Sequence, residues 1–191
     1  MTRREVRLAG FGGQGLLLAG IILGRTAALY ENKHAAQTQS YGTEARGGAS
    51  QCNVVIDDHE ITYVGVVHPD LFLVMSQEAY DKLVTDVKEG GFVFYDSDLV
   101  RPAERSDLRQ VPVPCTKTAR GLGREMVANI VMLGAALRGV RILDPENVKK
   151  CLMESVPPGT EELNLKAFAA GQELVPKTEE EGRFAERSKL G

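Results

Sequence analysis

The feature that most constrains the fold of this chain is a glycine cluster between a strand-like run and a long apolar run. Residues 5–10 alternate towards an apolar end, which is typical of a first β-strand. Gly10, Gly12 and Gly15 then satisfy the pattern G-x-G-x-x-G, and residues 16–30 are apolar on nearly every side, as in a buried helix. Glycines permit a tight turn, and a helix N-terminus presents unpaired N–H groups to an anion. The cluster is therefore a candidate phosphate cradle formed by Gly10, Gly12, Gly13, Gln14 and Gly15.

The remainder of the chain continues to alternate between strand and helix patterns. Apolar runs at 70–76 and 92–95, with helical spacing over 80–87 between them, imply a right-handed crossover and parallel pairing. The run 61–67 is expected to pair with a strand at 50–56 as an antiparallel hairpin across residues 57–60. Further strands are expected at 35–41 and 111–115, and further helices at 127–137, 146–153 and 163–174. The predicted architecture is an α/β three-layer sandwich with a mostly parallel sheet and an antiparallel hairpin excursion.

A single α/β domain is expected over residues 1–175, followed by a charged C-terminal tail over 176–191. Half of the residues in that tail are charged, which is typical of a solvated segment. The formal charge of −3 gives no indication of a basic surface that would bind nucleic acid. No tryptophan is present on which nucleic-acid bases could stack. The longest apolar stretch, 16–23, is far short of a membrane span, and the N-terminus offers no signal-peptide cleavage site. A cytoplasmic protein that binds neither membrane nor nucleic acid is expected.

Cysteines and histidines are few and scattered along the chain. The three cysteines show no C-x-x-C spacing, so neither a disulfide framework, an iron–sulfur cluster nor a metal site is expected. The sequence also contains no G-x-S-x-G, H-E-x-x-H or P-loop pattern, and we assign no catalytic residue.

Two interpretations of the glycine cluster remain open on sequence grounds. A dinucleotide-binding fold should place an acidic residue at the end of its second strand, and the run 35–41 has none, which disfavours NAD. The glycines could instead bind another phosphate-bearing ligand, or they could serve only close packing of strand against helix.

A second loop, from Tyr41 to Gly48, combines glycines with two opposite charges. A solvated turn does not need Tyr41 and three glycines in eight positions, so the loop is a candidate for binding an anion or a partner. Arg46 is suited to bidentate recognition of phosphate or carboxylate. The alternative is a local ion pair between Glu44 and Arg46, worth roughly 0–1 kcal/mol. The candidate partner-binding residues are Tyr41, Glu44, Arg46 and Gly47.

The combination of GFGGQG at 10–15 and AQTQSYGTEARGG at 36–48 resembles the gamma subunit of 2-oxoacid:ferredoxin oxidoreductases. The stretches 129–134 and 164–171 also resemble that family, so the resemblance spans the chain from about residue 6 to about residue 174. The extended second motif more closely resembles the 2-oxoglutarate subgroup than the pyruvate subgroup.

The resemblance implies an accessory subunit of a complex that decarboxylates a 2-oxoacid oxidatively to an acyl-CoA and passes electrons to ferredoxin. Alpha and beta subunits, and in some complexes a delta subunit, are the implied partners, and ferredoxin is reached through the complex. Those subunits are expected to hold thiamine diphosphate, magnesium and iron–sulfur clusters, while this chain binds no cofactor tightly. This chain would help form the coenzyme A site, through the glycine loop and Arg46, and the subunit interface.

By itself the chain is expected to be inactive and able to homodimerise through its uncovered interface. Two other functions are compatible with the residues alone: a free-standing module that binds a dinucleotide or coenzyme A, and a purely structural subunit.

Overall fold

The computed structural model describes residues 3–41 and 50–176. In this part of the chain, one mixed sheet contains six strands in the order β2-β3-β1-β4-β5-β6. The strands are β1 (Arg4–Gly10), β2 (His34–Tyr41), β3 (Ser50–Asp57), β4 (Leu71–Val74), β5 (Phe92–Asp96) and β6 (Arg109–Val113). Parallel pairing joins β1 to β4, β4 to β5, and β5 to β6. The expected β-α-β crossover is therefore confirmed.

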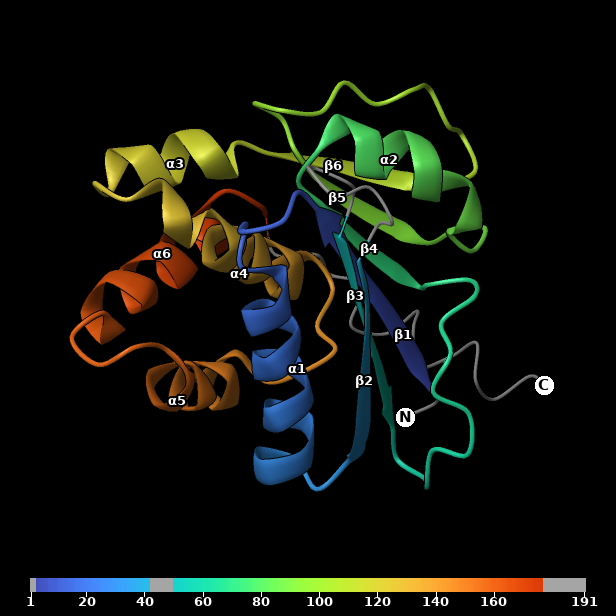
Figure 1. Ribbon diagram of the computed structural model, residues 1–191, viewed down its shortest axis with the longest axis horizontal. Coiled ribbons are helices and arrows are strands. Elements are labelled where there is room, and N and C mark those ends of the chain that lie inside the picture. The colour runs from blue at the N-terminus through green and yellow to red at the C-terminus, as the bar shows by residue number, and fades with distance from the viewer. Residues whose placement is uncertain (1–2, 42–49, 177–191) are drawn as a thin grey trace.

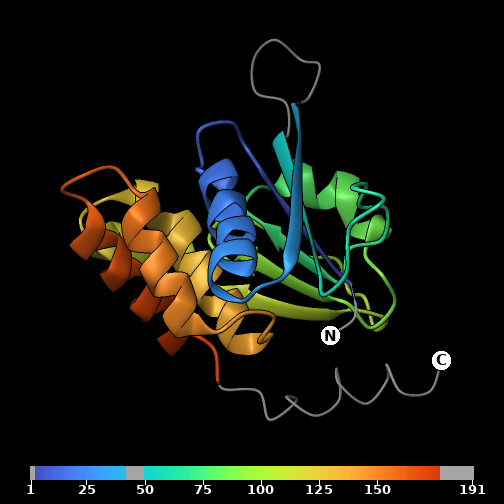
Figure 2. The same cartoon turned by 90° about the horizontal axis from the view of Figure 1, so that it is seen from below.

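Helices cover both faces of this sheet (Figures 1 and 2). The α-helices are α1 (Leu16–Tyr30), α2 (Gln77–Leu83), α3 (Cys115–Gly121), α4 (Ala128–Gly139), α5 (Pro145–Ser155) and α6 (Glu161–Glu173). Two short 3-10 turns, η1 (Val84–Asp86) and η2 (Glu125–Val127), complete the described elements. Figures 1 and 2 show α2 on one side of the sheet and α1, α4, α5 and α6 on the other. None of the helices in the described ranges is long and apolar enough to cross a membrane.

Strand β4 shows how the chain supports two cores at once. All four of its residues are buried, and successive side chains point to opposite faces of the sheet. Leu71 and Leu73 join the core beneath α1 and α4, whereas Phe72 and Val74 join the core beneath α2. The predicted three-layer α/β sandwich is confirmed.

The antiparallel part of the sheet is present, but its pairing differs from the expected hairpin. Strand β3 lies antiparallel between β1 and β2, so that Ser50 is opposite Gly10 on one side and Tyr41 on the other. The expectation that 61–67 pairs with 50–56 is wrong, and 61–67 forms no strand. Both edges of β3 are already occupied by β1 and β2, which leaves 61–67 no edge to pair with.

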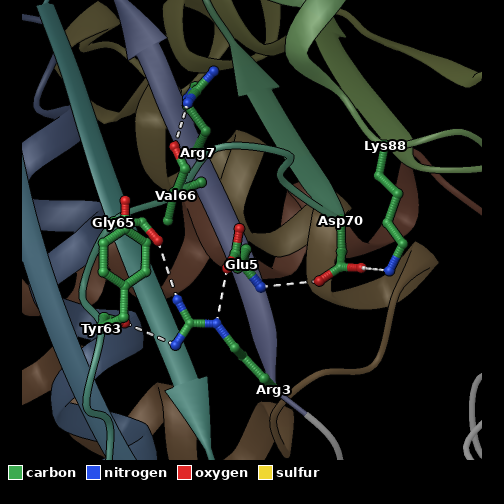
Figure 3. A network of polar contacts seen from close by, with 8 residues as sticks. All are labelled: Arg3, Glu5, Arg7, Tyr63, Gly65, Val66, Asp70 and Lys88. Carbon is green, nitrogen blue, oxygen red and sulfur yellow. Dashed lines mark hydrogen bonds and ion pairs between the residues drawn. The ribbon is translucent and has the colours of Figure 1, made fainter.

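Two arginines hold the segment 61–67 in place: Arg3, just before β1, and Arg7, within β1 (Figure 3). Arg3 donates to the carbonyl oxygens of Tyr63 at 2.8 Å and Gly65 at 3.1 Å. Arg7, which is only 4% exposed, donates to the carbonyl of Val66 at 2.7 Å. The apolar composition that suggested a strand here belongs instead to an irregular segment anchored by charged side chains.

The stretches 129–134 and 164–171 lie in α4 and α6, where two glycines allow a close helix contact. A Cβ on Gly134 would lie 2.2 Å from the carbonyl oxygen of Phe168. A Cβ on Gly171 would lie 2.0 Å from the carbonyl oxygen of Val131. No real Cβ approaches backbone so closely, so both glycines are explained by the packing of α4 against α6.

Other differences from the sequence prediction are confined to element boundaries and one short helix. Residues 115–121 form α3, which the sequence did not suggest because CTKTARG carries no apolar periodicity. The helix expected at 80–87 begins at Gln77, because the Ser76 hydroxyl accepts from the backbone N–H of Ala79 and caps it.

Candidate functional site

The glycine loop lies at the carboxyl end of β1, where the connections that leave two neighbouring parallel strands run to opposite faces of the sheet. The chain leaves β1 into α1 on one face of the sheet, and leaves the adjacent parallel strand β4 into α2 on the opposite face (Figure 1). In open α/β sheets, ligands bind in the crevice outside the carboxyl ends of strands at such a switch point. The position of the loop therefore agrees with a ligand site.

Two of the loop glycines adopt a left-handed backbone conformation that the turn into α1 requires. Gly13 has φ +89° and Gly15 has φ +72°, a region that side-chain-bearing residues rarely adopt. The backbone N–H of Gln14 donates to the carbonyl of Phe11 at 3.3 Å and closes the turn. Gly15 is the N-cap residue of α1 and has no side chain with which to cap it. The first turn of α1 therefore begins without a side-chain cap.

The glycines differ in the physical reason for their presence. A Cβ on Gly10 would lie 2.2 Å from Gln14 Oε1, and a Cβ on Gly15 would lie 2.4 Å from Asn129 Nδ2. Packing therefore explains Gly10 and Gly15. A Cβ on Gly12 would meet nothing within 4 Å, and its φ is not in the left-handed region. Neither packing nor backbone strain within the described chain requires glycine at position 12.

The side chain of Gln14 joins the loop to the end of β4. Its Oε1 accepts from the backbone N–H of Phe11 at 2.6 Å, and its Nε2 donates to the carbonyl of Met75 at 2.9 Å. The carboxamide therefore bridges the chain at the ends of β1 and β4.

Asn129 holds the other end of the loop, and it was not among the site residues expected from sequence. Its Nδ2 donates to the carbonyl of Gly15 at 2.9 Å, and the residue is only 4% exposed. Its Oδ1 is buried and has no hydrogen-bond partner among the described residues, a costly state for a carbonyl oxygen. Two sequence signals could have found Asn129: it is a polar residue at the start of a long apolar run, and it begins the stretch 129–134 that resembles the family.

Two described residues that flank 42–49, Tyr41 and Ser50, lie in strands level with Gly10. Ser50 is opposite both Gly10 and Tyr41, and its hydroxyl donates to the carbonyl of Gly10 at 3.4 Å. The backbone of Tyr41 belongs to β2, whereas Glu44, Arg46 and Gly47 lie outside the described residues. The strand register therefore aligns the backbone of Tyr41 and Ser50 with Gly10, at the start of the glycine loop.

Large apolar side chains are exposed close in sequence to the residues that build the loop. Phe11 is 43% exposed, Leu17 is 40% exposed and Met126 is 80% exposed. Exposed apolar side chains next to a ligand-type loop are typical of a surface that another subunit covers.

A pocket lined by charged residues lies at the opposite ends of the strands from the glycine loop. It has a volume of about 710 Å³ and lies at the amino ends of the parallel strands. Arg3 pairs with Glu5 at 2.8 Å, and Figure 3 shows Lys88 paired with Asp70, at 3.2 Å. These pairs leave the charges of the pocket largely satisfied within the chain, which favours a structural role.

Neither a metal site nor a reactive thiol emerges from the described residues. No cluster of three or more metal-ligating side chains occurs among residues 3–41 and 50–176. The three cysteines, Cys52, Cys115 and Cys151, are all buried. Burial raises the pKa of the Cys52 thiol to about 11 and that of Cys115 well above its ordinary value, so both are protonated at neutral pH.

These features define a doubly wound α/β domain whose glycine loop lies at a topological switch point. The family described as pyruvate ferredoxin/flavodoxin oxidoreductase matches residues 5–174, and the chain belongs to this family. The 2-oxoglutarate synthase subunit KorC of Methanocaldococcus jannaschii is 52% identical over 91% of this chain and 94% of its own length. The expected resemblance to gamma subunits is also confirmed by solved structures.

Two solved structures share the fold over nearly the whole chain. The gamma subunit of a keto/oxoacid ferredoxin oxidoreductase from Geobacter sulfurreducens has a TM-score of 0.83 and 41% identity, over 91% of this chain and 97% of its own. The 2-oxoglutarate:ferredoxin oxidoreductase of Magnetococcus marinus, with 2-oxoglutarate, coenzyme A and succinyl-CoA bound, has a TM-score of 0.80. Its identity is 22%, and the match covers 93% of this chain but 32% of that one, so it shows the fold alone.

Proposed function

We propose that this chain is the gamma-type accessory subunit of a 2-oxoglutarate:ferredoxin oxidoreductase, and that its glycine loop helps to form the coenzyme A site. The complex would convert 2-oxoglutarate and coenzyme A to succinyl-CoA and carbon dioxide, with two electrons leaving to ferredoxin. The similarity to a subunit of 2-oxoglutarate synthase supports the oxoacid, and coenzyme A is bound in the structural relative from Magnetococcus marinus.

One observation carries the assignment of the loop, namely the open space at Gly12. A glycine that neither packing nor φ requires leaves room for something from outside the chain to approach the backbone. The pyrophosphate of coenzyme A fits such a place, because the loop leads into the uncapped N-terminus of α1.

The residues of this chain would bind and orient coenzyme A without taking part in bond making. Backbone N–H groups around Gly12 and Gly13 would donate to phosphate oxygens, and Arg46 would supply a guanidinium for phosphate or for a partner carboxylate. Thiamine diphosphate and iron–sulfur clusters, held by the other subunits, would supply the decarboxylation and the electron transfer.

The partners proposed for this surface are the alpha and beta subunits, with delta where the complex contains one. Phe11, Leu17 and Met126 would become buried when these subunits assemble, which explains large apolar side chains exposed beside the loop.

The Gly12→Val variant tests the proposal in the assembled complex. We expect KM for coenzyme A to rise about tenfold or more, with kcat and KM for 2-oxoglutarate nearly unchanged, because only the approach of the ligand is blocked. Gly121→Val is the matched control, since Gly121 in α3 also has open space at its Cβ position and an ordinary φ. An unchanged KM for coenzyme A in a complex that assembles normally would contradict the proposed site.

A further inference from the structure

The hydrogen-bond ladder between β1 and β4 stops one bond short of the glycine loop. The backbone N–H of Met75 donates to the carbonyl of Ala9 at 2.9 Å. In a parallel ladder, the next bond would run from the N–H of Phe11 to the carbonyl of Met75. Those two groups do not bond each other here, because each is bonded to Gln14.

The carboxamide of Gln14 takes the place of that missing bond. Its Oε1 accepts from Phe11 at 2.6 Å and its Nε2 donates to Met75 at 2.9 Å, so one amide group lies between the two strand ends. The fit is tight on the side of β1, where a Cβ on Gly10 would come within 2.2 Å of Oε1. A side chain from the loop itself therefore fills the gap between the two strand ends and satisfies the backbone group on each side.

Side-chain hydrogen bonds consequently hold both ends of the loop, whereas no atom of the described chain fills the space beside its middle residue, Gly12. Gln14 fixes the peptide N–H of Phe11 against β4, and Asn129 fixes the carbonyl of Gly15 against α4 at 2.9 Å. Gly12 lies between these two braces, with nothing within 4 Å of its Cβ position. Donors that are held in place before binding lose less entropy when a ligand arrives.

We propose that Gln14 is a positioning residue for coenzyme A, one that aims the backbone N–H groups of the glycine loop by bridging Phe11 to Met75. This inference rests on the proposed function of the loop. It requires a side chain that both accepts and donates a hydrogen bond, which a neutral carboxamide does and a carboxylate does not.

The Gln14→Glu variant separates positioning from simple filling of space. At about pH 8 its carboxylate can accept from Phe11 but opposes the carbonyl oxygen of Met75, since both are acceptors. Once protonated, the same carboxyl group can accept and donate, as the native carboxamide does. Its pKa should lie above the ordinary value of about 4.3, because only the neutral form satisfies Met75. Gln14→Met, of similar length but without either hydrogen bond, is the matched control.

The measurement is the affinity of the assembled complex for coenzyme A, by calorimetry, at about pH 8 and about pH 5, relative to wild type at each pH. We expect both variants to bind about tenfold or more weakly at the higher pH, and only Gln14→Glu to recover most of that loss at the lower pH. Hydrogen exchange of the Phe11 amide in the full chain should be faster than in wild type for Gln14→Met at both pH values, because only that variant lacks an acceptor for the amide. If Gln14→Met does not assemble, exchange of its Phe11 amide in the isolated chain still tests the bridge, and exchange as slow as in wild type would overturn it. A loss of affinity in Gln14→Glu alone, with Gln14→Met near wild type, would show repulsion of the phosphates by the carboxylate and would also overturn the positioning role.

The outcomes distinguish this inference from the proposed function. If Gly12→Val weakens coenzyme A binding while both Gln14 variants bind within about twofold of wild type, the positioning role is overturned and the loop site stands. If none of the three variants alters binding, both the loop site and the role of Gln14 are overturned. Equal losses in both Gln14 variants at both pH values, with no recovery, would also overturn the requirement for a donor and acceptor pair.

Discussion

Asn129 and Gly15 are joined by a hydrogen bond and by close packing at the same atom. Asn129 Nδ2 donates to the carbonyl oxygen of Gly15 at 2.9 Å, and a Cβ on Gly15 would lie 2.4 Å from that nitrogen. These residues are 114 positions apart in sequence and bring α4 against the start of α1. The start of α1 is thus shaped by a side chain of α4.

Gly15→Ala should destabilise the chain by about 2–4 kcal/mol. Alanine is strained at the left-handed φ of this residue, and its Cβ would displace the Asn129 side chain. In an Asn129→Ala background the same change should cost less, because the steric part is removed. Urea unfolding of the four variants of this cycle measures the difference. Gly12→Ala is the control and should lie within about 0.5 kcal/mol of wild type. Equal costs for Gly15→Ala in both backgrounds would contradict the packing argument.

Arg7→Met should destabilise the chain by about 3 kcal/mol and loosen the segment 61–67. The buried Arg7 guanidinium donates to Asn53 Oδ1 at 3.1 Å, to the Val66 carbonyl at 2.7 Å and to Asp86 Oδ2 at 2.5 Å, and its loss removes this donor from all three acceptors. Cleavage by chymotrypsin at Tyr63, which is 61% exposed, should therefore become faster.

The control for this prediction is Lys88→Met, which removes a lysine that is 64% exposed and paired with Asp70. A change of only about 0–1 kcal/mol is expected there. Unaltered chymotrypsin cleavage in Arg7→Met would show that the arginine does not anchor the segment.

Stability should fall as the pH rises past the ordinary pKa of cysteine, because burial raises the pKa of Cys52 to about 11 in the folded chain. Above about pH 9 the unfolded chain releases the thiol proton while the folded chain keeps it, so the unfolded state gains stability. The slope due to this one thiol is about 1.4 kcal/mol per pH unit between those two pKa values. Below the unfolded pKa, the contribution of Cys52 is complete and does not change with pH.

Urea unfolding of wild type and Cys52→Ala across this alkaline range isolates the effect, because other titrating groups are common to both. The difference in unfolding free energy between the two proteins should shrink as pH rises. A difference that stays constant with pH would show that the thiol ionises equally in the folded and unfolded chains.

Arg46→Ala should leave the isolated chain folded and cost the complex on the order of 2–5 kcal/mol in binding coenzyme A or a partner subunit. Arg46→Lys should recover only part of this loss, because an ammonium cannot reproduce the bidentate fork of a guanidinium. Assembly and KM for coenzyme A are the measurements. Wild-type values in Arg46→Ala would instead favour a merely local ion pair with Glu44, worth about 0–1 kcal/mol.

Much of the fold could be predicted because its signals are local. The strand, glycine turn and apolar helix from Glu5 to Tyr30 are encoded by neighbouring residues, and so is the buried β4, whose four apolar residues reflect burial on both faces. The α/β class, the crossover from β4 to β5 and the position of the glycine loop at a strand end all follow from such patterns. The glycine motif also indicated a ligand site, although not which of its glycines packing requires.

Only the tertiary structure decided which strand edges meet and which side chains brace the loop. An apolar run at 61–67 looks like a strand locally, but β1 and β2 already occupy both edges of β3, and Arg3 and Arg7 anchor the run instead. Gln14 reaches Met75 across 61 residues and Asn129 reaches Gly15 across 114. Local composition indicates most of the strands and helices, whereas these contacts depend on which partners remain unsatisfied once the sheet has formed. The sequence alone therefore determined where the glycine loop lies, and the tertiary structure determined that Gln14 and Asn129 hold its two ends in place.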